Sequence, residues 1–351
     1  MLRGPFLNPW DAQTWYPLIE RGHDVKFIGA KNLNFFDISR IPNVILTNFV
    51  KINKTYVSLD LQKFLKNFDI VHSVETYHLF TLQCAIFKNI FGYKLFITQW
   101  ENIAYPDSSI AGNIIRRNVK TRVDKIIAVT KKSKDVLLEE STDENKIEIL
   151  PPGIDLNIFK PNKSSLRDNF DDEVIVLFIG RLVEEKGVRD LLDAMQKIWQ
   201  KVQSVRLIIC GNGPLRSLVL SYIKQGYPIT YYSSYPYPEV NMLYNACDIF
   251  ILPSKATKGW EEQFGMVLIE AMACRKPVIT TKSGSIPYVV GKCAYLVNPG
   301  SVPEIGKALL ELIDNEALRK KMGKSSRKFV EKKYDNRIIA KKLLKIYNSK
   351  Y

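Results

Sequence analysis

Two glutamates on either side of an expected helix start are the clearest candidates for chemistry in this sequence. Glu262 lies in a polar loop, and Glu270 lies about one turn inside a helix that apolar residues at three-residue spacing predict from Met266 onward. A helix start offers unpaired backbone N–H groups and the positive end of the helix dipole, which suit a phosphate. The two carboxylates therefore bracket a candidate anion-binding site, although their spacing fits two solvated surface glutamates equally well.

A second loop supplies the positive charge that a phosphate ligand needs. Arg181 and Lys186 follow the strongly apolar residues 174–180, which predict a buried strand. The planar guanidinium and the compact ammonium group both suit phosphate oxygens. Solvated surface cations are the alternative, but the glycines that bound this turn favour the binding role.

Two further loops consist of small residues. Gly213 lies in the turn 211–214, and Ser283 and Gly284 lie in a loop after the apolar residues 277–280. Glycine lets the backbone approach a ligand closely, so such loops can admit a phosphate or a sugar. Each loop alone is a weak signal, since many turns have this composition.

The elements that must position these loops alternate between short apolar strands and helices. This alternation predicts an α/β protein with two doubly wound parallel sheets, in residues 1–160 and 161–330, that face each other across a cleft. Ligands of such sheets bind at the carboxyl ends of the strands. Helices are expected over residues 11–21 and 56–67. The chain opens in what looks like the loop after a first strand, so we expect that strand to be missing from the N-terminal domain.

The composition is that of a globular protein. The 351 residues are 46% hydrophobic, and no apolar run reaches the roughly 20 residues of a membrane span. The five cysteines are scattered without a metal-binding spacing, so we expect reduced thiols and no structural zinc. No signal-peptide core opens the chain, and these features together predict a cytoplasmic protein.

The net charge of +15 is concentrated near the C-terminus. Residues 316–351 hold 13 Lys and Arg against 3 acidic residues, and their apolar positions predict amphipathic helix rather than a disordered tail. A solvated helix face and attraction to an anionic membrane surface are both open, and the basic residues 114–122 raise the same question of packed helix or membrane contact. Nucleic acid ranks last as a partner, because no nucleic-acid-binding motif accompanies the charge.

Taken together, the four loops resemble the family-4 retaining glycosyltransferases of GT-B fold. The matching segments follow one another at the family's spacing over roughly residues 150–310, and the resemblance is looser before them. The resemblance implies two Rossmann-like domains and a basic C-terminal helix, residues 331–351, that crosses back to the N-terminal domain. The segments that carry it are Gly180-Arg181-Leu182 with Lys186-Gly187, Gly211 with Gly213-Pro214, Trp260 to Gly265, Glu270 to Ala273, Pro277-Val278 and Ser283-Gly284.

The resemblance implies a role for each residue on the donor side. Arg181 and Lys186 match the pair that neutralises the donor diphosphate. Glu262 matches the residue that faces the donor sugar, and Glu270 matches the one that accepts hydrogen bonds from ribose hydroxyls. Phe264, Gly265 and Met266 match positions that bind the donor through their backbone amides. The remaining donor-binding positions are Gly213, Ser283 and Gly284.

The implied activity is metal-independent, retaining transfer of a hexose from a nucleotide-diphosphate sugar to a glycan, glycolipid or polysaccharide. The nucleotide sugar is a co-substrate, and no cofactor or metal is expected. No Asp-x-Asp metal motif is evident, and Arg181 and Lys186 can neutralise the leaving group instead. The alternative is a catalytically inert GT-B protein that binds a nucleotide sugar or a partner enzyme, which a missing first strand would favour.

Departures from the family pattern concern mainly the acceptor side. Val74 replaces the second histidine of a His-x-His pattern, and His72 matches the first, which is more often structural. His72 is thus the weaker candidate for a contact to the acceptor or sugar, Glu75 is the better one, and Glu101 after the next strand is a third. Arg275 takes a place that glycine usually holds at a helix end.

Overall fold

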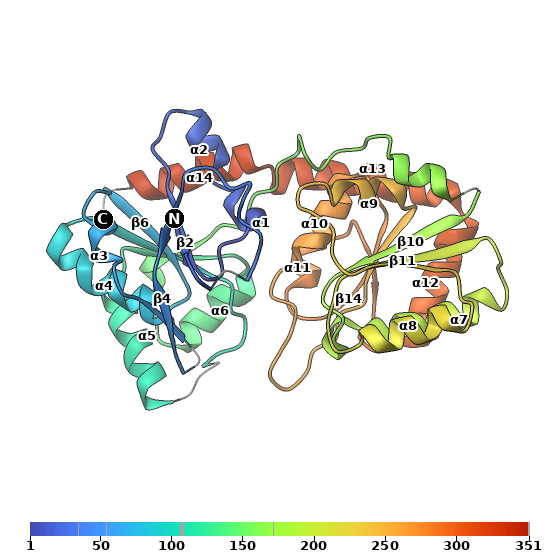
Figure 1. The fold of residues 1–351 in the computed structure, drawn as a ribbon, viewed down its shortest axis with the longest axis horizontal. Coiled ribbons are helices and arrows are strands. Elements are labelled where there is room, and N and C mark those ends of the chain that lie inside the picture. Colours follow the sequence, from blue (N-terminus) through green and yellow to red (C-terminus); the bar gives the residue numbers. More distant parts are fainter. Residues whose placement is uncertain (34, 54, 106–108, 171, 350–351) are drawn as a thin grey trace. The chain divides into compact units, whose positions relative to one another are not determined.

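The chain folds into two compact α/β units (Figure 1). The computed structural model describes residues 1–33, 35–53, 55–105, 109–170 and 172–349. Residues 1–153 and 336–351 form the N-terminal unit, and residues 154–335 form the C-terminal unit. The division therefore falls before the expected boundary at residue 160, and the returning segment begins at residue 336 rather than 331.

Two parallel sheets form the centre of the N-terminal unit. One has the order β1-β2-β3 and the other the order β6-β7-β8-β9. Because β1 lies next to β6, successive strands run outward from this point in both directions, which makes it a topological switch point. The strands are β1 (Leu2–Gly4), β2 (Phe27–Ala30), β3 (Val44–Thr47), β6 (Ile70–Val74), β7 (Lys94–Gln99), β8 (Lys125–Ala128) and β9 (Ile147–Ile149).

The first strand, which we expected to be missing, is present as β1. Leu2 pairs with Ile28 of β2. Arg3 is buried, forms an ion pair with Asp11, and donates from Nη1 to the Ser73 carbonyl of β6 at 3.0 Å, which connects β1 to β6. The expectation was wrong because a three-residue strand with a buried arginine lacks the apolar run that marks a buried strand.

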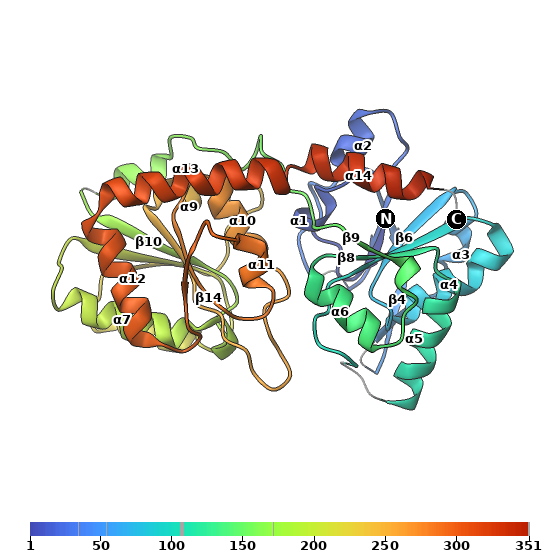
Figure 2. The ribbon, with the colours of Figure 1, turned by 180° about the vertical axis from the view of Figure 1, so that it is seen from behind.

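Helices cover both faces of these sheets (Figures 1 and 2). α4 packs beside α5, and α14 packs beside α2. α14 buries Ile339, Leu343 and Tyr347 in the core, so the C-terminal segment is an integral part of this unit. The helices are α2 (Tyr16–Glu20), α4 (Leu79–Phe91), α5 (Ile110–Arg122), α6 (Lys131–Glu139) and α14 (Asn336–Asn348).

The helix expected over residues 56–67 begins instead as a strand. β5 (Thr55–Ser58) pairs antiparallel with β4 (Phe49–Ile52), and only α3 (Gln62–Leu65) is helical. Burial alternates along β5, with Tyr56 and Ser58 inside, and its β-branched residues suit a pleated surface better than a helix.

The helix expected over residues 11–21 is divided into α1 (Pro9–Ala12) and α2. Pro17 lies in the first turn of α2, where its missing N–H has no intrahelical partner to lose. A proline at that position starts a new helix rather than continuing the preceding one.

A single six-stranded parallel sheet forms the centre of the C-terminal unit. Its order is β12-β11-β10-β13-β14-β15. The order reverses between β10 and β13, and ligands of such sheets bind outside the carboxyl ends of strands at this switch point. The strands are β10 (Val174–Ile179), β11 (Val205–Cys210), β12 (Ile229–Tyr232), β13 (Ile249–Leu252), β14 (Val278–Thr281) and β15 (Tyr295–Val297).

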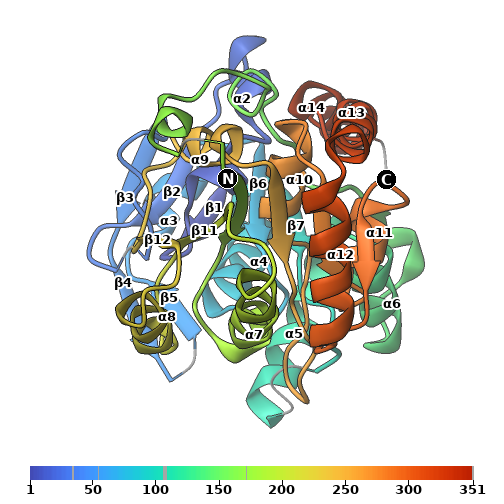
Figure 3. The same cartoon turned by 90° about the vertical axis from the view of Figure 1, so that its right-hand side faces the viewer.

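Helices also cover both faces of this sheet. α7 and α12 lie side by side on one face (Figure 3), and α10 packs against α13 on the other (Figure 2). None of the helices in the described part of the chain has the length and apolar character that crossing a membrane requires. The helices are α7 (Val188–Trp199), α8 (Arg216–Lys224), α9 (Asn241–Ala246), α10 (Met266–Ala273), α11 (Ile286–Val290), α12 (Val302–Asp314) and α13 (Glu316–Lys333).

α10 ends in a turn that favours glycine but contains arginine. Arg275 has φ +59, in the left-handed region, and its N–H donates to the Met272 carbonyl at 3.1 Å. The Lys276 N–H donates to the Ala271 carbonyl at 3.0 Å, which completes a Schellman motif. An arginine in this conformation is strained, because its Cβ crowds the backbone.

Replacing Arg275 by glycine should therefore stabilise the protein. We expect Arg275→Gly to raise the free energy of unfolding by up to about 1 kcal/mol in urea titrations. As a matched control, Lys328→Gly at an exposed position inside α13 should lower it by about 1 kcal/mol. Equal destabilisation by both substitutions would contradict the strain at Arg275.

Candidate active site

The candidate site of the C-terminal unit lies where the loops after β10 and β13 meet. Gly187 follows the short helix η3 (Glu184–Lys186) with φ +70, and a Cβ there would lie 2.1 Å from the Pro253 carbonyl oxygen. Only glycine tolerates both this conformation and this approach. The Lys255 N–H also donates to the Glu185 carbonyl at 2.8 Å. The two loops are thereby held together at the switch point.

A buried ion pair joins these loops. Lys186 Nζ lies 2.6 Å from Glu262 Oε2, and Ser254 Oγ donates to the same oxygen at 2.8 Å. Glu262 is 6% exposed, so the pair lies mostly away from water. The Trp260 ring, centred 4.9 Å from Nζ, adds a cation–π contact. The pair fixes the position of Glu262, because either charge alone would be buried without its counter-charge.

The loop after β14 packs against the backbone of Glu262. The Ser285 N–H donates to the Glu262 carbonyl at 2.9 Å. Gly284 has φ +52, and a Cβ there would lie 2.2 Å from the Glu262 carbonyl oxygen, which excludes every other residue. Ser283 is buried, and its Oγ has no hydrogen-bond partner among the described residues. A buried hydroxyl in this state is ready to bond a ligand.

Arg181 and Gly213 lie on adjoining loops after β10 and β11. The Leu182 N–H donates to the Asn212 carbonyl at 2.9 Å, and the Leu215 N–H donates to the Leu182 carbonyl at 2.9 Å. The Arg181 side chain is 61% exposed and lies 3.6 Å from Glu185 Oε1. Its guanidinium is therefore accessible to a ligand, and giving up the surface contact with Glu185 would cost little free energy.

The start of α10 faces the same loops. Gly265 is the N-cap residue with φ +80, Met266 is the first helical residue, and within the described residues no side chain caps this end. The backbone N–H groups of the first turn can therefore donate hydrogen bonds to an anion. The Phe264 side chain is buried with its ring 5.7 Å from that of Tyr334, so its ring is part of the core and does not reach a ligand.

Glu270 lies on the buried side of α10. It is 4% exposed, and the Tyr244 hydroxyl of α9 donates to its Oε2 at 2.6 Å. Burial raises the pKa of Glu270 to about 7, although the Tyr244 hydrogen bond acts in the opposite direction. The carboxyl group is thus poised between its neutral and charged forms near neutral pH.

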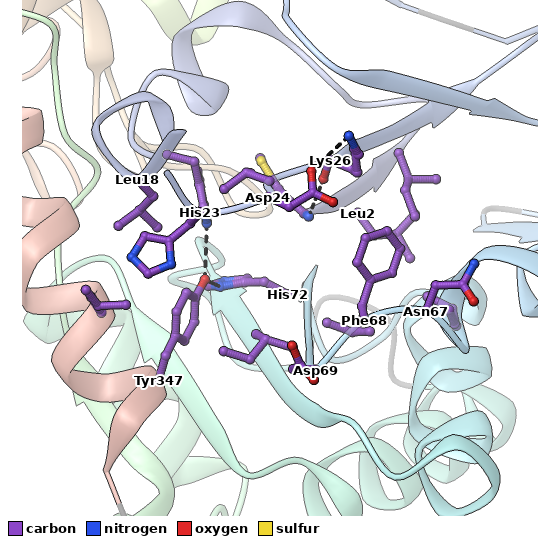
Figure 4. A pocket seen from close by; sticks show the side chains of 18 residues that line it. Leu2, Leu18, His23, Asp24, Lys26, Asn67, Phe68, Asp69, His72 and Tyr347 are labelled. Atoms are coloured by element: carbon purple, nitrogen blue, oxygen red, sulfur yellow. Dashed lines mark hydrogen bonds and ion pairs between the residues drawn. The ribbon is translucent and has the colours of Figure 1, made fainter. Parts of the chain in front are cut away.

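His72 of the N-terminal unit is fully engaged in the core (Figure 4). Trp15 Nε1–H donates to the Tyr347 hydroxyl at 3.1 Å, and this hydroxyl shares a hydrogen bond with His72 Nδ1 at 2.5 Å. His72 Nε2 shares another with the Thr98 hydroxyl at 2.7 Å. Burial lowers the pKa of His72 well below its ordinary value, so the ring is neutral. Neither ring nitrogen is left for a ligand.

Glu75 and Glu101 follow neighbouring strands of the same unit. Glu75 comes directly after β6 and is buried; its Oε1 accepts from the Trp100 N–H at 2.9 Å, whereas Oε2 has no partner among the described residues. Glu101 comes after β7 and is partly exposed, and its Oε1 accepts from the N–H groups of Asn102 and Ile103 at 3.0 and 3.1 Å. Both carboxyl groups thus lie at the carboxyl edge of the sheet.

Three residues of these networks had no role assigned from the sequence. Ser254 and Trp260 stand next to the ion pair, and Tyr244 holds Glu270. Ser254 lies two residues after the end of β13, and a polar residue close to a strand end is a usable signal. Tyr244 shows no such signal, because its contact depends on how α9 packs against α10.

The sequence matches two protein-family models. Residues 160–329 match the glycosyl transferases group 1 model, and residues 18–158 match the glycosyltransferase family 4 model. The chain is a family-4 glycosyltransferase. The two models divide the chain close to the boundary between its two units.

Two relatives illustrate how this glycosyltransferase compares with known proteins. The capsular polysaccharide biosynthesis glycosyltransferase CapM of Staphylococcus aureus is 28% identical over 239 residues, which cover 64% of this chain and 61% of CapM. An uncharacterized glycosyltransferase of Methanocaldococcus jannaschii is 28% identical over 332 residues, 90% of this chain and 88% of that protein. The match thus spans less than two thirds of CapM and most of the archaeal relative.

Solved structures show the same fold. The crystal structure of Anabaena HepE in complex with UDP and glucose superposes with a TM-score of 0.80, 17% sequence identity and 99% coverage of both chains. The glycosyltransferase therefore has the GT-B fold, with two Rossmann-like units.

The raised pKa of Glu270 predicts how stability depends on pH. Because the folded-state pKa of about 7 exceeds the ordinary value of 4.5, the neutral carboxyl group favours the folded state below about pH 4.5, and this advantage is lost as the pH rises through 7. Compared with Glu270→Gln, the wild type should lose roughly 2 kcal/mol of unfolding free energy between about pH 5 and pH 8. Urea titrations at both pH values measure this, and parallel profiles for the two proteins would contradict it.

Proposed function

We propose that this glycosyltransferase moves a hexose from a nucleotide-diphosphate sugar to a hydroxyl group of a glycan, glycolipid or polysaccharide, with retention and without a metal ion. The observation that carries the proposal is the convergence of Arg181, Lys186 and Glu262 with the start of α10 at one switch point. Cations and free backbone amides at that place suit a diphosphate.

The charges suit the bond that must break. Cleavage of the bond between the sugar carbon and the diphosphate oxygen develops positive charge on the sugar and negative charge on the leaving group. Arg181, Lys186 and the α10 amides stabilise the leaving diphosphate, which is the task that a metal ion performs elsewhere. Lys186 is already paired with Glu262, so the bound diphosphate shares its ammonium group with that carboxylate.

Glu262 faces the donor sugar in this proposal and does not attack it. Its Oε2 already accepts from Lys186 and Ser254, which lowers its nucleophilicity and suits it to accept hydrogen bonds from the sugar through its remaining capacity. The acceptor oxygen forms its bond to the sugar on the face from which the diphosphate departs, and the acceptor proton passes to a phosphate oxygen. Retention follows without the two-carboxylate scheme of the glycosidases.

Glu270 and Ser283 complete the donor site. Glu270, about one turn inside α10, accepts hydrogen bonds from the ribose hydroxyls while Tyr244 holds its carboxyl group in place. Ser283 supplies a hydroxyl that has no partner among the described residues. A Cβ at Gly213 would lie 2.5 Å from the Leu182 carbonyl oxygen, so glycine lets this loop lie against the loop that carries Arg181.

The acceptor class is supported by the relatives and by surface charge. CapM is named for capsular polysaccharide biosynthesis, and HepE was solved with UDP and glucose.

Exposed lysines follow one another along α13. They suit an anionic membrane surface, at whose inner face a lipid-linked acceptor would be extended. Co-sedimentation with anionic but not zwitterionic vesicles tests this location. The lysines are Lys321, Lys324, Lys328 and Lys332.

Arg181→Ala is the cleanest test of the donor site. The side chain is mostly exposed, so the free energy of unfolding should change by less than about 0.5 kcal/mol. Transfer should fall by roughly 100-fold or more, because a cation that stabilises the leaving group is lost. Arg189→Ala is the matched control, since Arg189 is similarly exposed but pairs with Glu184 at 2.8 Å. Turnover at the wild-type rate in Arg181→Ala would refute the assignment.

The same assay separates the proposal from its alternative. The product should keep the anomeric configuration of the donor in proton NMR spectra, and excess EDTA should not change the rate. Inversion, or a rate lost to EDTA and restored by a divalent ion, would contradict it. Binding of UDP-, GDP- or ADP-sugars without transfer to any acceptor would favour the inert protein. Because β1 is present, the only support left for the inert alternative is Val74, which replaces the second histidine of the family's His-x-His pattern.

A further inference from the structure

The switch point of the N-terminal unit carries a second set of polar groups. β1 leads through β2 to β3 on one side, and β6 leads through β7 to β9 on the other. The hydrogen bond from Arg3 Nη1 to the Ser73 carbonyl at 3.0 Å marks the junction of β1 and β6. Glu75 follows β6 directly, so it stands where a parallel sheet offers its ligand site.

Glu75 has a backbone conformation that glutamate rarely adopts. Its φ is +55, in the left-handed region, and its N–H donates to the Thr98 carbonyl at 2.9 Å. A strained residue persists only where the surrounding structure holds it, and such residues gather at ligand sites. The side chain is 5% exposed, with Oε1 bonded to the Trp100 N–H and Oε2 without a partner among the described residues.

Two further residues of this loop, Thr76 and His78, are also buried. Thr76 Oγ1 and His78 Nδ1 have no hydrogen-bond partner among the described residues. Burial lowers the pKa of His78 to about 3, so its ring is neutral. Residues 75–78 of this strand-end loop thus hold three buried polar atoms whose hydrogen-bonding capacity is unused among the described residues.

The charged groups around Glu75 favour its neutral form. Burial raises the pKa of Glu75 to about 8, and the Glu101 carboxylate from the loop after β7 adds to this rise. The Trp100 and Glu101 N–H groups and the Arg3 guanidinium act in the opposite direction, but they do not outweigh burial, and Arg3 is ion-paired with Asp11. Tyr77 lies on the same loop, and the guanidinium carbon of Arg116 from α5 is 5.8 Å from the centre of the Tyr77 ring.

We propose that Glu75 binds the acceptor as a neutral carboxylic acid, donating a hydrogen bond from its unpartnered oxygen to a hydroxyl group of an uncharged sugar. The inference rests on the proposed function and specifies the class of acceptor. An anionic acceptor group would meet the Glu101 carboxylate, while Arg3 is held by Asp11 and Arg116 lies 3.7 Å from Glu140. The site therefore selects a polyhydroxyl group without charge. Glu75 acts through binding, and the acceptor proton goes elsewhere.

Two variants of Glu75, compared with the wild type, separate this role from a structural or basic one. Glu75→Gln keeps the shape and a donor N–H, so acceptor binding should persist at every pH. In the wild type, the acceptor KM should rise roughly tenfold between about pH 7 and pH 9 as the acid ionises, whereas the acceptor KM of Glu75→Gln should stay constant. Glu75→Gly removes the carboxyl group but suits φ +55, so its Tm should equal or exceed that of the wild type while acceptor binding falls about tenfold or more.

Binding measurements keep this test independent of transfer. Saturation-transfer NMR with the methyl glycosides of glucose, galactose, mannose and N-acetylglucosamine should show binding to the wild type and to Glu75→Gln, and weaker binding to Glu75→Gly. Binding without transfer would leave the inference standing and refute the proposed function. Glycoside binding that is absent in the wild type or unchanged in Glu75→Gly would overturn the inference. So would a loss of kcat in Glu75→Gln at unchanged acceptor KM, because a base would then be required.

Discussion

The buried contact between Lys186 and Glu262 is the interaction on which the donor site depends. It joins the loop after β10 to the loop after β13, which are neighbours in the sheet but 76 residues apart in the chain. Neither charge would be tolerated there alone, because a charge without its counter-charge is costly away from water. The pair therefore requires both loops to be in place, and Gly187 and Gly284 allow the backbone approaches that put them there.

The two units use the same kind of place for opposite chemistry. Each has a switch point where the strand order reverses, and each carries its candidate residues at the carboxyl ends of the strands beside it. In the C-terminal unit these residues are cations and a helix start, which suit a diphosphate. In the N-terminal unit they are Glu75, Thr76 and His78, which are buried and have unsatisfied atoms among the described residues. One fold thus offers a place for an anion and a place for an uncharged sugar.

The residues of the proposed donor site could be picked out from the sequence because they stand in short, recognisable segments. Strongly apolar strands followed by glycine and charge placed Arg181, Lys186 and Glu262 at strand ends, and the helix-end position of Arg275 proved to have the left-handed backbone that favours glycine. The hydrogen bond from Tyr244 to Glu270 could not be predicted, because helix packing and not local sequence sets it. Likewise, only the folded N-terminal unit shows that Tyr347 occupies a nitrogen of His72. β1 was missed because it is short and contains a buried arginine.

The central claim is that a nucleoside diphosphate binds beside Lys186 and shares its charge with Glu262. Titration calorimetry of UDP, GDP and ADP against the wild type, Lys186→Gln and the double variant Lys186→Gln with Glu262→Gln tests it most directly. The double variant removes the buried unpaired carboxylate, so it controls for damage to the loops. The preferred nucleotide should bind at least about tenfold more weakly to both variants than to the wild type, a loss of about 1.4 kcal/mol of binding free energy. Equal affinity for all three proteins would contradict it.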